Sequence, residues 1–210
     1  MANRKLAADL DLSTEEKIKE AARIVFQKKG YSATRTRDIA EEAGINLALL
    51  NYYFRSKENL FEIIMMETIN GFVHSMDHVL NDENTTLMQK VELIASGYID
   101  FVSNKPDVPL FMLSEIRNNA EGLLKKIPFG NLFVRSVCYR QYNQAYSEGL
   151  VKESNAFHFI LNLLGMIIFP IVASPLLKKV ADISDEDFQK MILERKRLIP
   201  IWIKATLTAE

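Results

Sequence analysis

Three residues at fixed spacing, Ala40, Gly44 and Leu50, constrain the fold of this chain most. A helix-turn-helix needs a small residue where its two helices touch, a flexible residue in the turn, and an apolar residue that holds the second helix against the core. These three residues meet the needs in that order. The spacing therefore predicts two short helices, over about residues 34–43 and 47–53. The alternative is a small helical subdomain whose polar face is only solvated.

Capping side chains and apolar stripes at helical spacing continue along the chain. Thr34, Asn46 and Ser56 each stand where an expected helix begins, and Gly30 suits the left-handed end of the first helix. No alternating pattern typical of strands is present. The expected helices span about residues 14–29, 34–43, 47–53, 56–80, 86–103, 108–118, 132–148, 154–177 and 184–207. Because Pro200 lies inside the last stretch, that helix is expected to kink there or to end just before it.

The expected fold class is therefore all-α, with about nine helices in two domains. A three-helix helix-turn-helix domain is expected over residues 1–56 and a larger helical domain over residues 57–210. An apolar fraction of 48% in 210 residues is ample for a packed core. The net charge of -1 argues against a chain that coats nucleic acid by bulk attraction. Residues 1–60 nevertheless hold 11 Lys and Arg against 9 Asp and Glu, so this end is expected to face anions.

Catalytic and metal-binding motifs are not found in the sequence. There is no Ser-His-Asp set, Gly-rich phosphate loop or multi-cysteine site, so neither enzymatic activity nor a cofactor is expected. Cys138 is the single cysteine, which excludes an intramolecular disulfide, and charges occupy the positions where a signal peptide would need an apolar stretch. A cytoplasmic location is expected. An all-helical enzyme and a helical interaction module that does not bind DNA are the alternatives.

The second short helix has an outward face suited to reading DNA. With Leu50 pointing inward, helical geometry places Leu47, Ala48, Asn51 and Tyr52 largely outward, where a helix in the major groove would meet base edges. The Asn51 amide can bond adenine N6 and N7 together, and Leu47 and Ala48 can contact thymine methyl groups. Asn51 is therefore the strongest candidate for a base-reading residue.

Polar and basic residues around this helix are candidate contacts to the DNA backbone. Arg35 and Arg37 lie in the first turn of the preceding helix and can reach phosphates or a guanine. Tyr53 and Lys57 are candidate phosphate clamps, and Lys57 begins the helix whose exposed amides also favour an anion. Asn46, at the start of the reading helix, completes this set of DNA-binding candidates.

Residues 14–61, TEEKIKEAARIVFQKKGYSATRTRDIAEEAGINLALLNYYFRSKENLF, closely resemble the amino-terminal domain of the tetracycline-repressor (TetR) family of bacterial transcription regulators. The matching parts are the apolar first helix that ends in KKGY, the segment TRDIAEEAGI, and YYFRSKENLF. They cover about a quarter of the chain. The remainder is similar to the family only in its all-helical layout.

This resemblance implies specific contacts and a mode of action. It implies DNA contacts at Thr36 and Arg37, at Tyr53, and at Lys57 as a phosphate anchor. It also implies that residues 57–210 form a ligand-binding and dimerisation domain, in which a small apolar or amphipathic molecule of unknown identity controls DNA binding. The expected protein is a homodimeric regulator, most simply a repressor, that binds a palindromic double-stranded DNA operator.

Three positions of the reading helix depart from the family pattern. Where many members have Gly or Pro this chain has Ala48, where they have a hydroxyl it has Leu49, and where an aromatic is common it has Asn51. Leu49 removes one expected phosphate contact, and Asn51 predicts a different operator preference.

Residues 154–177 carry no formal charge and are long enough to cross a bilayer, for which about 20 apolar residues are needed. His158, Asn162 and Pro170 inside the stretch, and the lack of a one-sided basic cluster, favour a helix buried on all sides instead, so no membrane partner is expected. Such a helix needs apolar cover. Dimerisation through it and the last helix, at about residues 187–207, is therefore expected, with reading helices roughly 34 Å, or a multiple of it, apart.

The middle helices carry bulky or flexible apolar side chains that are candidates for the ligand pocket. For any single one of them, core packing is the alternative. The candidates are Met65, Met66, Tyr98, Phe101, Phe111, Met112, Phe133, Tyr142 and Met166.

Two minor alternatives concern His74 with His78, and Cys138. The histidines are one helical turn apart with Asp77 beside them, a spacing that can ligate a metal, but no third ligand is evident and no metal is expected. Cys138 has arginines nearby in sequence, which leaves redox sensing open, although buried thiols are usually inert.

Overall fold

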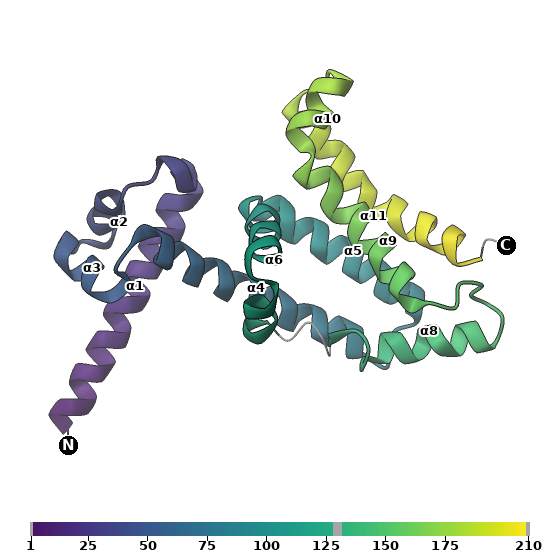
Figure 1. Ribbon diagram of the computed structural model, residues 1–210, viewed down its shortest axis with the longest axis horizontal. Helices are drawn as coiled ribbons and strands as arrows, with labels where there is room; N and C mark the ends of the chain where they lie inside the picture. The colour runs from purple at the N-terminus through teal and green to yellow at the C-terminus, as the bar shows by residue number, and fades with distance from the viewer. Residues whose placement is uncertain (1, 128–131, 209–210) are drawn as a thin grey trace. The chain divides into compact units, whose positions relative to one another are not determined.

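The computed structural model describes residues 2–127 and 132–208, with side chains from residue 14 onward. These residues form ten helices and no strand, which confirms the all-α fold class (Figure 1). The chain divides into two compact units, one up to Thr68 and the other from Ile69 onward. The helices are α1 (Ala2–Ala33), α2 (Thr36–Ala43), α3 (Leu47–Phe54), α4 (Lys57–Asn81), α5 (Leu87–Asn104), α6 (Asp107–Lys126), α8 (Val137–Ser147), α9 (Ala156–Val172), α10 (Ser174–Ala181) and α11 (Asp185–Thr208).

The junction between α1 and α2 differs from the expectation at Thr34. Gly30 adopts φ 73° and ψ 162° and kinks α1. The positive φ favours glycine, but the conformation is not the left-handed helical cap that the sequence predicts. The prediction that Thr34 caps α2 is wrong: the residue is buried and its hydroxyl donates to the Gly30 carbonyl oxygen at 2.7 Å. Arg35 stands at the cap position instead, and its backbone N–H donates to the Asp38 carboxylate at 2.9 Å. The acidic side chain in the first turn thus replaces the hydroxyl cap.

The first unit includes the beginning of α4, beyond the domain end predicted at residue 56. The Phe61 ring packs against Phe26 and Tyr31, with ring centroids 5.1 and 4.4 Å apart. Further along α4, Glu67 accepts a hydrogen bond from the ammonium of Lys19 at 2.7 Å. These contacts tie α4 to α1 up to the end of the first unit.

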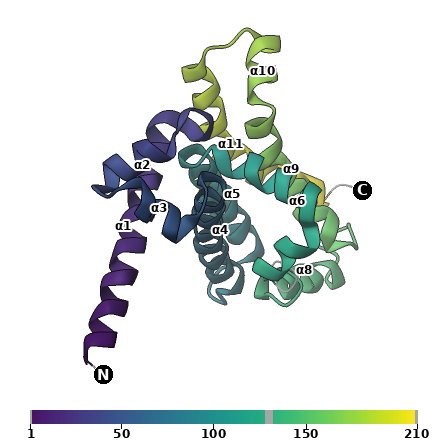
Figure 2. The same cartoon turned by 60° about the vertical axis from the view of Figure 1, so that its left-hand side comes forward.

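In the second unit, α5, α9 and α11 surround the core and lie side by side in both views (Figures 1 and 2). Ile99, Leu163 and Ile199, one from each of these helices, are completely or almost completely buried. The fully buried Lys90 of α5 donates to the Thr85 carbonyl at 2.9 Å and to the Thr85 hydroxyl at 2.6 Å. Its charge is thereby solvated by the turn that joins α4 to α5, because buried ammonium groups need hydrogen-bond acceptors.

The uncharged segment from 154 to 177 is not the single helix, buried on all sides, that the sequence predicts. It forms α9 and the first half of α10, which are bent by 71° relative to each other. Pro175 lies in the first turn of α10, and lacking an N–H it cannot continue the hydrogen bonding of α9. The outer face of α9 exposes Phe157, Leu161 and Phe169. Within the described residues no single helix is long and apolar enough to cross a membrane, and α9 and α10 meet that test only as a bent pair.

Two prolines lie inside helices of the second unit, and the helices continue through both. Pro170 cannot donate to the carbonyl of Met166, one turn earlier in α9. The Arg195 guanidinium of α11 donates to that carbonyl instead, through Nε at 3.2 Å and Nη2 at 2.8 Å. Pro200 lies within α11, which extends to Thr208, so the predicted alternative of a helix end before this proline is wrong.

Candidate nucleic-acid interface and ligand cavity

The turn between α2 and α3 has the geometry that the spacing of its residues predicts. Gly44 adopts φ 64° and ψ 36°, where a side chain would be strained. The Ile45 N–H donates to the Ala40 carbonyl at 3.0 Å, which closes the end of α2. Ala40 and Leu50 are 4% and 0% exposed, so the small contact residue and the inward anchor are both confirmed.

The outward face of α3 is accessible over its whole length. The Asn46 side chain accepts a hydrogen bond from the Leu49 N–H at 2.8 Å, which confirms it as the cap of this helix. Ala48, Asn51 and Tyr52 are exposed, and Tyr52 is 76% exposed although it is a large aromatic residue. An exposed aromatic beside an exposed amide offers both an apolar surface and a hydrogen-bonding group, which suits a groove with apolar and polar edges.

The other DNA-binding candidates surround this face within the same unit. Arg35 and Arg37 are exposed at the start of α2, while Thr36, Leu47 and Tyr53 are half-buried. All five lie in or beside the two helices of the motif. Their contacts with DNA remain predictions.

Lys57 has a structural role that its position in the sequence does not reveal. Its ammonium donates to the carbonyl oxygens of Tyr31 and Thr34 at 3.0 and 3.1 Å and lies 4.2 Å from the centre of the Tyr31 ring. The end of α1 and the turn to α2 are thereby held against the start of α4. A phosphate contact by Lys57 remains a prediction, but the side chain is already engaged in the fold.

The second unit contains a cavity of about 530 Å³ within the described residues. Four of the nine expected pocket residues line it, namely Tyr98, Phe101, Met112 and Phe133. The walls come mainly from α4, α5, α6 and α9. The lining residues are Ile69, Phe72, Val73, Met76, Leu80, Ile94, Tyr98, Phe101, Val102, Val108, Pro109, Met112, Leu113, Ile116, Ala120, Leu123, Leu124, Leu132, Phe133, Ile160, Leu164 and Ile168.

The other five expected pocket residues do not line the cavity. Met65 and Met66 are buried in the first unit, and Tyr142 is fully buried in the core of the second. Phe111 lies on α6 but out of phase with the positions of that helix that face the cavity, and Met166 packs against the core. Bulk alone therefore does not distinguish a lining residue from a core residue.

Apart from Met112, the residues of α6 that line the cavity are not among the pocket residues that the sequence predicts. Val108, Met112, Ile116 and Leu123 recur at helical spacing, yet α6 buries few of its residues. A stripe of this kind normally marks a face against the core. Here the stripe faces a cavity, and only the tertiary packing reveals the difference.

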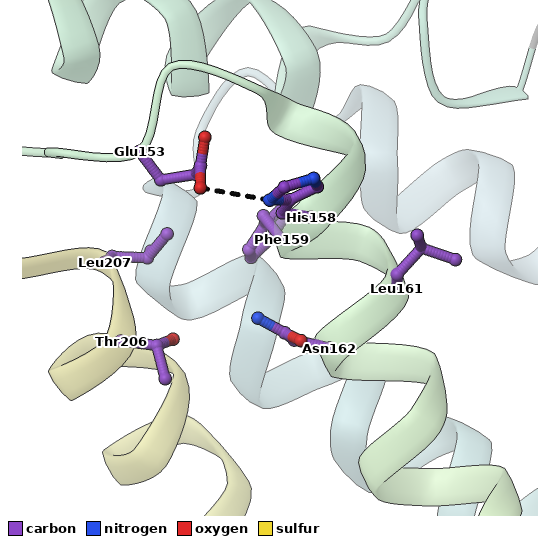
Figure 3. Close-up of a pocket in the computed structure, with 7 residues that line it drawn as sticks. All are labelled: Glu153, His158, Phe159, Leu161, Asn162, Thr206 and Leu207. Carbon is purple, nitrogen blue, oxygen red and sulfur yellow. Dashed lines mark hydrogen bonds and ion pairs between the residues drawn. The ribbon is translucent and has the colours of Figure 1, made fainter.

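A second, smaller pocket of about 180 Å³ lies between α9 and the end of α11 (Figure 3). The His158 Nδ1 lies 3.1 Å from a carboxylate oxygen of Glu153, and Asn162 and Thr206 extend toward the space between the helices. The Glu153 pKa is lowered, first by a hydrogen bond from the Asn155 backbone and then by His158. Glu153 and His158 are thus engaged with each other, and the Thr206 hydroxyl donates to the Ile203 carbonyl at 2.9 Å. The space is also small for an effector.

The metal and redox alternatives gain no support. The Nε2 atoms of His74 and His78 are 3.2 Å apart on the exposed face of α4, and no group of three metal-ligating residues occurs in the part of the chain that the structure describes. Cys138 is fully buried, and burial raises its pKa to about 12. The reactive thiolate is therefore disfavoured at neutral pH.

Comparison with known proteins agrees with the geometry of the first unit. Residues 18–64 match the model of the bacterial regulatory proteins of the tetR family. The chain is a TetR-family transcriptional regulator. This match covers α2 and α3 entirely, together with parts of α1 and α4.

Relatives of this TetR-family regulator extend the likeness over nearly the whole chain. It is 25% identical over 202 residues to the probable HTH-type transcriptional regulator YttP of Bacillus subtilis, covering 93% of this chain and 95% of that protein. A TetR transcription regulator from Haloarcula marismortui has the same fold, with a TM-score of 0.66 at 19% identity, over 93% of this chain and 98% of that one. The regulator FadR from Bacillus subtilis, in complex with stearoyl-CoA, has a TM-score of 0.58 at 17% identity, over 91% and 98% of the chains. Like these relatives, the chain is a regulator and not an enzyme.

Proposed function

We propose that this regulator is a homodimeric repressor that binds a palindromic DNA operator through α3 and is controlled by a mainly apolar molecule bound in the cavity of the second unit. The observation that carries the proposal is the pairing of an exposed reading helix with an apolar cavity in one chain. A cavity of about 530 Å³ lies within the range of roughly 300–1,000 Å³ typical of small-molecule sites.

Helix α4 is the element through which ligand and DNA binding can be coupled. Its first part packs in the first unit through Phe61 and Glu67, and its second part lines the cavity through Phe72 and Met76. A ligand that packs against the second part can bias the tilt of the helix. Such a ligand changes DNA affinity only if it binds one arrangement of the reading heads better than the other.

The FadR neighbour supports a lipid-like ligand for this fold, since it was solved with stearoyl-CoA. The apolar lining of the present cavity is consistent with a hydrocarbon chain. The protein acts as a repressor if the two reading helices of the unliganded dimer are spaced to fit the operator. Ligand binding then changes that spacing and releases the DNA.

A gel-shift experiment with DNA from around the protein's own gene tests the proposal. We expect the chain to retard one fragment that contains a palindrome, and an apolar ligand that binds the cavity to release it. Activation by ligand would contradict the repressor assignment. If every compound that binds the cavity leaves DNA affinity unchanged, control by ligand is wrong.

The homodimer is inferred from the exposed apolar face of α9. Phe157, Leu161 and Phe169 are 56%, 60% and 63% exposed, and Gly165 lies between them with nothing near its missing side chain. Ile201 of α11 is 53% exposed as well. Large apolar side chains at this spacing need cover, and Gly165 permits the close approach of another helix. The proposed interface pairs α9 and α11 with their copies, which corresponds to the two helical segments expected from the sequence.

Substitution of Leu161 by Asp is expected to convert the dimer to a monomer, because two buried carboxylates would face each other across the two-fold axis. Sedimentation or light scattering measures the mass. The matched control is Leu110→Asp, a leucine of α6 that is 57% exposed and does not line the cavity, and it should remain a dimer. If the Leu161→Asp variant remains a dimer with an unchanged dissociation constant between its subunits, the interface lies elsewhere.

A further inference from the structure

The cavity of the second unit is unusual in its lack of charge. No lining residue among those that the structure describes carries a formal charge, and the hydroxyl of Tyr98 is the one polar side-chain group in the lining. An ion held against these walls at Tyr98, away from the exposed Ile116 and Leu124, would lose its hydration and find no countercharge. The lining therefore disfavours charged ligands, whatever their shape.

Tyr98 is placed to form one hydrogen bond with a ligand. Its ring lies beside Phe72 and Phe101, which stack on each other with centroids 4.0 Å apart, so the aromatic cluster holds it in position. Its hydroxyl has no hydrogen-bond partner among the described residues. Burial raises the pKa of Tyr98 to about 12, so the phenol keeps its proton and remains a donor at neutral pH.

Tyr98 is half-buried, and its hydroxyl lies in an apolar cavity without a protein partner. A ligand oxygen at this point would give it a hydrogen bond in surroundings of low polarity. A hydrocarbon without any polar atom would leave the hydroxyl unpaired. A carboxylate would satisfy the hydroxyl but would bring a charge that the remaining walls cannot stabilise. The lining thus selects a molecule between these two extremes.

Building on the proposed function, we infer that the effector is an uncharged, hydrocarbon-rich molecule with a hydrogen-bonding oxygen that pairs with the Tyr98 hydroxyl, as in a medium-chain alcohol. The chain fills the space between α4, α5, α6 and α9. The oxygen lies at the aromatic cluster, in contact with α5.

Calorimetric titration of the full chain with 1-decanol and with decanoate at pH 8 tests this inference. The two probes have the same carbon chain and differ in charge. We expect 1-decanol to bind at least about tenfold more tightly than decanoate, since the carboxylate must be desolvated without a cation. Equal or tighter binding of decanoate would overturn the inference.

Two variants identify the site of binding. Tyr98→Phe removes only the hydroxyl and is expected to weaken 1-decanol binding about 3- to 10-fold, with little effect on decanoate. Tyr146→Phe, which alters a tyrosine that is 44% exposed and outside the cavity, should bind 1-decanol as the unchanged protein does. Met112→Trp narrows the cavity and should abolish binding of both probes. Unchanged 1-decanol affinity in Tyr98→Phe would contradict the assigned hydrogen bond.

The ligand class and the proposed function can fail separately. If 1-decanol binds and is lost in Met112→Trp, but operator affinity does not change, the ligand class stands and ligand control of DNA binding is wrong. If 1-decanol does not bind while decanoyl-coenzyme A releases the operator, the ligand class is wrong and the proposed function stands.

Discussion

The variant Asn51→Ala is expected to lose about 30-fold or more in affinity for the operator while the protein remains folded. A bidentate contact between an amide and adenine contributes roughly 1–3 kcal/mol of discrimination, and a two-fold dimer makes the contact twice. The Asn51 side chain is exposed and makes no hydrogen bond within the described part of the chain, and Ala is the better helix former. Fluorescence anisotropy with the operator, together with circular dichroism, measures both effects.

The matched control is Gln27→Ala, which removes an exposed amide from α1 and should bind the operator normally. The affinity of Asn51→Ala for the operator should also change little when the contacted base pair is replaced, because the side chain that recognises this base pair is absent. If the variant binds the operator and the substituted operator as the unchanged protein does, Asn51 is not a base reader. Lys57→Ala is a poorer test of DNA contact, since Lys57 holds the Tyr31 and Thr34 carbonyls and its loss would perturb the fold.

The variant Arg195→Met is expected to lower the free energy of unfolding of the second unit by about 1.5–3 kcal/mol, the range for hydrogen bonds from a charged donor. Met keeps much of the apolar stem but leaves the Met166 carbonyl without the partner that Pro170 cannot provide. For a chain of this length the loss corresponds to a fall of roughly 3–12 °C in melting temperature. Urea denaturation and calorimetry of the full chain measure it.

The background variant Pro170→Ala isolates the cause. An alanine at this position restores an N–H that can donate to the Met166 carbonyl, so Arg195→Met should cost about 1 kcal/mol less in this background than in the unchanged chain. Lys190→Met, at an exposed position of α11, is a control for the removal of a cation from the helix. If the cost of Arg195→Met is the same in both backgrounds, the proline does not account for the role of the arginine.

Much of the first unit was predictable because its determinants are local. Gly44 has a left-handed conformation, Asn46 caps the next helix and Leu50 is buried, and each of these depends on residues within a few positions. The prediction for Thr34 is wrong because a hydroxyl can bond forward to a helix start or backward to a helix end, and its neighbours do not decide between them.

The ligand cavity was predictable only in part. Aromatic residues such as Tyr98 and Phe101 were identifiable as candidates, but so was Tyr142, which is buried in the core. An apolar stripe on a helix has the same pattern whether it faces a packed neighbour or an empty space. The length and phase of α6, which covers the cavity, therefore had to come from the packing.

The sequence by itself determined the all-helical class and the helix-turn-helix, because helical periodicity, caps and a turn glycine act over a few residues. It also predicted a DNA-binding regulator, through a motif whose residues lie close together in the chain. Only the tertiary structure decided that Lys57 anchors the fold, that Arg195 bonds the carbonyl left by Pro170, and that Tyr98 faces an uncharged cavity. These features join residues that are distant in the chain, and a side chain's partner across such a distance depends on how the helices pack.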